Sequence, residues 1–298
     1  MHGELLVAIF AGLGGMLGWG SADFFAKKTV DKIGDIASLV WAHIFGTAIF
    51  VTIAVYEVVV VGRHFAISFD LNTWLGLVFF GSLQALVYLL VYKAFSKGQL
   101  SLLNPIFASF SGLVAIFSIL VFGEKLNLFI LLALLSIFLG ILLMNLNVQA
   151  FLSKKIRLDY VSGLKEISLA TILAAIWTLS WDKFVTGHDW LVYALCMYAF
   201  MTIAALVISR VYKTNLSAVP RGIWKFLILI GLGETVAYLA ITLGYSTTSF
   251  TSVVALLSGA FSLPTLILAR VFLKENVTKL QTVGSLVIIA GLVLLSLQ

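Results

Sequence analysis

The chain has little charge, almost no cysteine and few prolines. Charged residues make up 11% of its 298 residues, against about a quarter of an average soluble domain, and this excludes an ordinary water-soluble enzyme. A single cysteine, Cys196, excludes a disulfide framework and a cysteine-based metal site. No segment is polar enough for a disordered tail or a flexible linker. With 61% hydrophobic residues along its whole length, the chain is predicted to lie in a lipid bilayer.

Two further classes of partner are disfavoured by how the charged and glycine residues are placed. The formal net charge is +6, but the lysines and arginines stand singly or in small groups between apolar runs, so no basic face for nucleic acid arises. The glycine-rich stretch 12–15 lies inside an apolar run and lacks the Lys and Ser/Thr of a nucleotide-binding loop. We therefore expect no nucleic acid partner and no direct use of ATP.

Continuous apolar runs, each about as long as a bilayer-spanning helix, predict an all-α integral membrane protein with ten transmembrane helices. Alternation of apolar and polar positions, which a membrane barrel would need, is missing. The runs are 5–26, 36–57, 73–95, 102–122, 127–147, 163–184, 190–210, 223–245, 250–273 and 278–297.

The distribution of basic residues predicts the orientation of these helices. All 19 lysines and arginines except Arg63, Lys125 and Lys183 lie near the loops that follow the first, third, fifth, seventh and ninth runs. Since basic residues mark cytoplasmic loops, these loops are expected inside and both termini outside. The composition predicts a multi-pass protein of the cell (plasma) membrane.

The two halves of the chain resemble each other, which indicates a duplication. At offsets of about 150 to 160 residues, similar residues recur in the same order along four of the five helices of each half. The matches include Ser21 with Ser180, Asp23 with Asp182, Gly81 with Gly231, Gln84 with Glu234, Tyr88 with Tyr238, Ser101 with Ser252, Glu124 with Glu275 and Gly140 with Gly291.

The duplication predicts the domain organisation. A first five-helix repeat covers residues 1–148, a cytoplasmic linker covers 149–162, and a second five-helix repeat covers 163–298. Because five is an odd number, the two repeats are expected to cross the membrane in opposite senses, as in many secondary transporters.

Short motifs give this architecture a family resemblance. Trp19-Gly20-Ser21, followed by Phe24, Phe25 and Lys27, ends the first helix, and Glu124-Lys125-Leu126 follows the fourth. With the duplication, these motifs resemble the EamA-type proteins of the drug/metabolite transporter superfamily over essentially the entire length. The resemblance implies two five-helix repeats and transport of small metabolites by alternating access, often export, without naming a substrate. Many members of that family are described with cytoplasmic termini, opposite to the orientation that the charges predict here.

Glu234 is the most conspicuous polar residue, because it lies at the centre of the eighth run. A carboxylate there is costly unless it faces the protein interior. It is predicted either to bind substrate or exchange protons, or to act as a hydrogen-bonding contact between helices.

Gln84 occupies the position in the first repeat that corresponds to Glu234 in the second. This predicts two polar groups near the midplane of one cavity. Tyr88 follows Gln84 by four residues and Tyr238 follows Glu234 by four, so each tyrosine shares a helical face with its polar residue. The two tyrosines are predicted either to contact the ligand or to fill the core.

Several other side chains are weaker candidates. Trp19 and Trp177 lie deeper than an interfacial aromatic belt requires, so they are expected to line the cavity or to fill the core. Pro264 falls inside the ninth run and is predicted to form either a hinge or a static kink. Asp23 stands four residues before Lys27, a spacing that predicts an ion pair.

His43 stands alone in the second run, without partners at metal-ligand spacing, and is expected to be a neutral hydrogen-bonded residue. We expect no metal and no cofactor.

The main functional prediction is a secondary transporter for a small metabolite such as an amino acid or an amine, with proton-coupled export as one form of it. The first alternative is a translocator of lipids or lipid-linked substrates on the same fold. An intramembrane enzyme is disfavoured, because the chain offers neither a deep Ser–His pair nor two central aspartates. Its partners are a small-molecule substrate and the bilayer, and the oligomeric state stays open.

Overall fold

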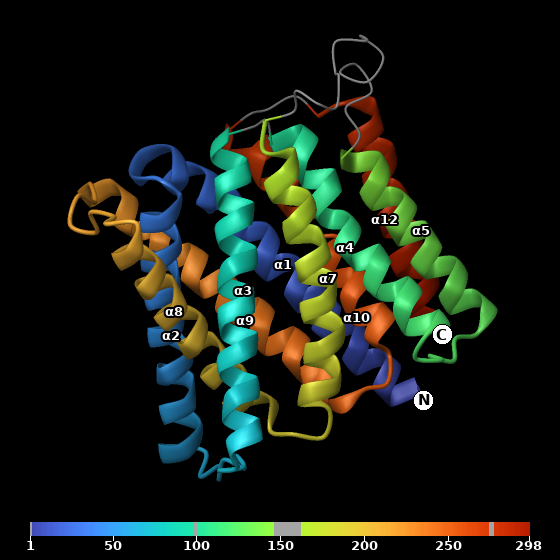
Figure 1. Ribbon diagram of the computed structural model, residues 1–298. Coiled ribbons are helices and arrows are strands. Elements are labelled where there is room, and N and C mark those ends of the chain that lie inside the picture. The colour runs from blue at the N-terminus through green and yellow to red at the C-terminus, as the bar shows by residue number, and fades with distance from the viewer. Residues whose placement is uncertain (1, 98–99, 146–161, 274–276) are drawn as a thin grey trace.

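The computed structural model describes residues 2–97, 100–145, 162–273 and 277–298, and these residues form helices without strands (Figure 1). The predicted linker 149–162 lies almost entirely outside the described residues, as does Glu275. The first half contains α1 (His2–Ile33), α2 (Asp35–Val59), α3 (Leu71–Lys97), α4 (Leu100–Leu120) and α5 (Leu128–Asn145). The second half contains α7 (Leu164–Val185), α8 (Trp190–Val211), η2 (Arg221–Ile223), α9 (Trp224–Thr247), α10 (Thr251–Gly259), α11 (Ser262–Leu268), η3 (Ala269–Leu273) and α12 (Lys279–Ser296).

The predicted all-helical membrane class is confirmed. Within the described residues, eight helical segments are long and apolar enough to cross a membrane, with α10, α11 and part of η3 forming one of them. Two shorter apolar helices, Ile106–Leu120 and Leu128–Met144, occupy the positions of the fourth and fifth predicted runs. The outer surface carries large apolar side chains, such as Phe10 at 70% and Leu75 at 57% exposure, which suits contact with lipid rather than water.

The ninth apolar run is interrupted rather than merely bent. The α10 helix ends at Gly259, α11 begins at Ser262, and the carbonyl of Ala260 accepts from the backbone N–H of Leu263 at 2.9 Å. Pro264 therefore lies in the first turn of α11, where its missing N–H removes no hydrogen bond. The break packs on α1, since the Thr265 hydroxyl donates to the carbonyl of Gly20 at 2.8 Å.

Helix packing repeats between the halves (Figure 1). The α1 helix contacts α9 and α10, and its repeat counterpart α7 contacts α3 and α4. The α2 helix contacts α9 as its counterpart α8 contacts α3. The remaining main contacts join counterparts to each other: α2 to α8, α4 to α10 and α5 to α12. The six helices α1, α3, α4, α7, α9 and α10 thus surround the centre, flanked by α2 and α8 on one side and by α5 and α12 on the other.

Repeat-equivalent glycines mark two close helix crossings. A Cβ atom at Gly231 would lie 2.6 Å from the backbone nitrogen of Gly46 in α2, and one at Gly81 would lie 2.6 Å from the carbonyl oxygen of Met197 in α8. Each glycine therefore lets two backbones approach where any side chain would separate them, the usual role of small residues between membrane helices. The duplication seen in the sequence thus corresponds to the same crossing made twice.

We expect Gly231→Ala to lower the free energy of unfolding by about 1–3 kcal/mol, because the added methyl group must push α9 away from α2. Thermal unfolding of the purified protein in detergent measures the change. Gly222→Ala is the matched control, since a Cβ atom at Gly222 meets nothing within 4 Å. Equal unfolding temperatures for the two variants would contradict the role assigned to this crossing.

Candidate transport cavity

A narrow cavity opens among α1, α3, α4 and α7, beside the break between α10 and α11. Its polar and aliphatic lining is Asp23, Gln84, Val91, Ala174 and Thr178, and its aromatic lining is Trp19, Tyr88, Phe107, Phe110, Trp177 and Phe261. The cavity volume is about 30 Å³, which is room for one or two water molecules. A metabolite can enter only when side chains or helices move apart.

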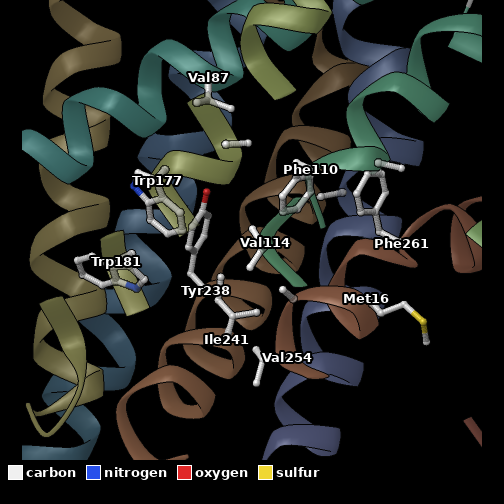
Figure 2. Close-up of a cluster of buried hydrophobic side chains, with 14 of the residues drawn as sticks. Met16, Val87, Phe110, Val114, Trp177, Trp181, Tyr238, Ile241, Val254 and Phe261 are labelled. Carbon is white, nitrogen blue, oxygen red and sulfur yellow. The ribbon is translucent and has the colours of Figure 1, made fainter. Parts of the chain in front are cut away.

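Aromatic rings gather around Tyr238 at one wall of the cavity. The Tyr238 ring lies edge-on to Trp19 at 5.8 Å, to Trp177 at 6.0 Å and to Tyr198 at 5.5 Å between centroids. Such edge-to-face arrangements are the favoured geometry for aromatic pairs. Figure 2 shows Trp177 beside Tyr238, with Phe110 and Phe261 across from them. Four of the six residues proposed from the sequence, Trp19, Trp177, Tyr88 and Gln84, line the cavity, and Tyr238 packs directly behind them.

Gln84 and Tyr238 join the two repeats by a hydrogen bond. The Gln84 Nε2 group donates to the Tyr238 hydroxyl at 2.7 Å, and Tyr88 interacts with the same hydroxyl. The Gln84 Oε1 atom is buried without a hydrogen-bond partner among the described residues. Since a buried unsatisfied carbonyl is costly, this oxygen is available to a donor that enters the cavity.

Glu234 lies one turn before Tyr238 on α9 and is 1% exposed. Its Oε2 atom accepts a hydrogen bond from the Tyr198 hydroxyl of α8 at 2.5 Å and lies 3.4 Å from the Nε2 atom of His43 on α2. His43 is fully buried and stacks on the Tyr198 ring at 5.3 Å. The carboxyl group is therefore enclosed by residues of three helices, behind the cavity wall rather than in it.

The His43–Glu234 pair has to hold a proton. The Nδ1 atom of His43 lies 2.7 Å from the carbonyl oxygen of Leu39, and a carbonyl can only accept, so Nδ1 carries hydrogen. If Nε2 carried no hydrogen and the Glu234 carboxyl were ionised, the Nε2 lone pair would face a carboxylate oxygen 3.4 Å away inside a low-dielectric interior. One proton on either Nε2 or the Glu234 carboxyl removes this repulsion. The arrangement can thus hold one proton between the two side chains.

Asp23 is the residue for which the sequence-based expectation is wrong. Lys27 pairs with Asp31, with 2.7 Å between Nζ and Oδ1, instead of with Asp23. Asp23 turns to the cavity, and within the described part of the chain it makes no ion pair. Both spacings of four residues suit a helical pair, so the sequence alone does not choose between them.

The sequence analysis missed His43 and Tyr198 as partners of Glu234. The sequence predicts a neutral hydrogen-bonded His43 without partners at metal-ligand spacing, and spacing along one helix carries no information about Glu234 on another. The crossing of α2, α8 and α9 brings these three side chains together. A usable signal existed: an apolar helix that buries a histidine and another that buries a glutamate are each costly unless the two residues meet.

A second polar cluster lies at the start of α10 and is called here the Glu124 cluster. The Glu124 carboxylate, from the loop after α4, accepts hydrogen bonds from the Ser252 backbone N–H at 2.9 Å and the Ser252 hydroxyl at 2.5 Å. The Thr251 hydroxyl donates to Asp182 of α7 at 2.9 Å. Acidic side chains at a helix N-terminus accept hydrogen bonds from its free N–H groups and interact favourably with the helix dipole. The cluster joins α4, α7 and α10 at the end of the bundle away from the cavity.

Burial raises the pKa of the Glu124 carboxyl, and the hydrogen bonds from Ser252 only partly offset this effect. Asp70, in the loop before α3, shows the opposite behaviour, because bonds from Ser68 and Thr73 hold the pKa of its carboxyl well below its usual range. Among the residues that the structure describes, no group of three or more His, Cys, Asp or Glu side chains is arranged to hold a metal ion.

These features define a multi-pass membrane protein made of two related halves around a polar and aromatic cavity. The model of the EamA-like transporter family matches residues 6–146 and again residues 162–297. The chain therefore belongs to the EamA-like transporter family, as the sequence motifs indicated.

Two other comparisons bear on the fold. A crystal structure of a protein superimposes with a TM-score of 0.73 at 14% sequence identity, over 97% of this chain and 96% of the other. At this identity the similarity shows the fold alone. No curated protein matches the sequence.

The raised pKa of Glu124 predicts a pH-dependent difference between the wild type and Glu124→Gln. The folded state holds this proton more tightly than the unfolded state does. The wild type should therefore lose stability relative to the variant as the pH rises from the ordinary glutamate value of about 4.3 through the raised pKa, and the difference should stay constant above it. Unfolding temperatures of both proteins across this range test the prediction, with Asp31→Asn as the exposed control. A difference that does not vary with pH would refute it.

Proposed function

We propose that this protein is a secondary transporter that moves a small metabolite across the membrane by alternating access. The observation that carries the proposal is the position of the cavity, which lies between the repeats, with the His43–Glu234 pair behind its wall. Membership of the family makes transport, rather than catalysis, the activity to be explained. Substrate in the cavity and a proton on the pair are then the two coupled cargoes.

We further propose that the repeats are inverted. Glu4, at the start of α1, accepts a hydrogen bond from Ser249 at 3.2 Å. Gly187, just after the end of α7, donates to the carbonyl of Ser246 at 3.1 Å. The beginning of α1 and the end of its counterpart α7 thus lie at the same end of α9, which supports opposite directions for the two helices. Opposite directions are what alternating access between exchangeable halves requires.

The cavity and the Glu124 cluster lie toward opposite ends of the same helices. On α4, the cavity residues Phe107 and Phe110 come early and Glu124 follows the helix. On α7, Trp177 precedes Asp182. We propose that the Glu124 cluster closes one end of the pathway while the other end leads to the cavity. The break before Pro264 is the proposed hinge, because it follows α10, which joins the cluster, and because its own Phe261 lines the cavity.

Near the cavity end lie Lys27, Lys28 and Lys32 in the last turns of α1, so by the charge rule this end faces the cytoplasm and both termini lie outside. We propose the plasma membrane as the location, where such an opening would load a substrate for export.

Coupling is tested with protein reconstituted in liposomes that contain a pH-sensitive dye. Panels of amines, amino acids, sugars and nucleosides are added outside, and proton flux is recorded for the wild type and Glu234→Gln. We expect one class of compound to drive flux in the wild type and none above the background of empty liposomes in the variant, because an amide cannot carry the proton. The glutamine oxygen can still accept from Tyr198, so the variant should fold.

Glu57→Gln is the matched control. Glu57 lies near the end of α2, with its Oε2 atom 3.9 Å from Nη1 of Arg63, and it does not line the cavity. It should retain the wild-type flux. Flux in Glu234→Gln equal to that of the wild type, or substrate transport without proton movement, would assign Glu234 to helix packing. No response to any soluble compound would count against a small-metabolite carrier and favour a lipid-linked substrate.

A further inference from the structure

The charge of the cavity is one-sided. Among the described residues that line it, Asp23 is the acidic one, and none is a lysine, arginine or histidine. The lysine nearest along the chain on the same helix face, Lys27, is already paired with Asp31. A carboxylate at membrane depth without a cationic partner is costly, and a bound cation relieves that cost.

The rest of the lining is chemically suited to the same kind of ligand. Six aromatic side chains contribute to the wall, and their ring faces carry partial negative charge. An organic cation gains from both Asp23 and the rings, whereas an anion is repelled by both. The free Gln84 Oε1 atom adds an acceptor for an N–H group.

A zwitterion fits this lining less well than a simple amine. The carboxylate of an amino acid needs donors, and the lining offers it only neutral ones, such as Thr178 and the buried Trp19 Nε1–H, which has no partner among the described residues. Burying that carboxylate beside aromatic faces, without a basic residue, costs desolvation free energy. Hydrogen bonds from these neutral donors offset only part of that cost.

We propose that the cavity selects organic cations, and that Asp23 binds the ammonium group while the aromatic wall contacts the hydrocarbon body. This inference rests on the proposed transport function and narrows its substrate to amines without an acidic group. Because the cavity is small in this conformation, binding separates the aromatic side chains and widens it.

Three probes with nearly the same aromatic body and different charge test the selection: phenethylamine, phenylalanine and 3-phenylpropionate. Isothermal titration calorimetry of the full-length protein in detergent measures their affinities. We expect phenethylamine to bind roughly tenfold or more tightly than either of the others. Asp23→Asn should weaken phenethylamine binding by a similar factor, and Asp23→Glu, which keeps the charge, should recover part of it.

Glu57→Gln is the matched control, because it removes an acid near the end of α2 whose Oε2 atom lies 3.9 Å from Nη1 of Arg63 and which does not line the cavity. It should bind phenethylamine like the wild type. Unfolding temperatures show whether each variant is folded. Equal affinity for all three probes, undiminished binding by folded Asp23→Asn, or no binding of phenethylamine would each overturn the inference.

The two proposals fail differently. If liposomes transport an amino acid or a sugar and binding is indifferent to Asp23, transport stands and cation selection is wrong. If phenethylamine binds through Asp23 and yet no amine crosses the liposome membrane, the cation site stands and the transport function is wrong.

Discussion

The backbone contact between α1 and α9 is the constraint on which the rest of the structure depends. A Cβ atom at Gly18 would lie 2.4 Å from the carbonyl oxygen of Gly233, and one at Gly233 would lie 2.6 Å from that of Gly18. Only two glycines allow this approach. It brings Trp19 against Tyr238 and holds Asp23 on the cavity side of α1, with Glu234 buried behind the cavity wall. The candidate site residues of the two halves are thus positioned by a contact between backbones.

Burial in a bilayer explains why the polar groups of this protein gather. A carboxyl group and an imidazole that face lipid would each cost several kcal/mol, so they are stable only where helices enclose them together. Glu234, Tyr198 and His43 satisfy one another in this way, yet Glu234 Oε1 and His43 Nε2 keep no hydrogen-bond partner among the described residues. A structural contact alone would leave fewer atoms unsatisfied. The pairing of this group is thus incomplete among the described residues.

Asp23 in α1 and Asp182 in its counterpart α7 occupy equivalent positions but have different surroundings. Asp182 accepts a hydrogen bond from Thr251 at one end of the bundle, while its repeat counterpart Asp23 faces the cavity and makes no ion pair with any described residue. The two equivalent positions thus have different environments in the same structure. In a protein whose halves exchange roles, such asymmetry separates a closed end from an end that leads to the cavity.

The sequence by itself determined the helical membrane class, the duplication and most of the candidate cavity residues. Apolar runs of bilayer length permit only helices, because backbone groups in lipid must be satisfied within each segment. Repeat alignment pointed to Gln84, Tyr88, Glu234 and Tyr238, since duplicated positions meet at the interface of the halves. Only the tertiary structure decided that His43 meets Glu234, that Lys27 prefers Asp31 to Asp23, and that the ninth run breaks before Pro264. Those outcomes depend on how helices distant in the chain cross, and helical spacing along one segment carries no information about that.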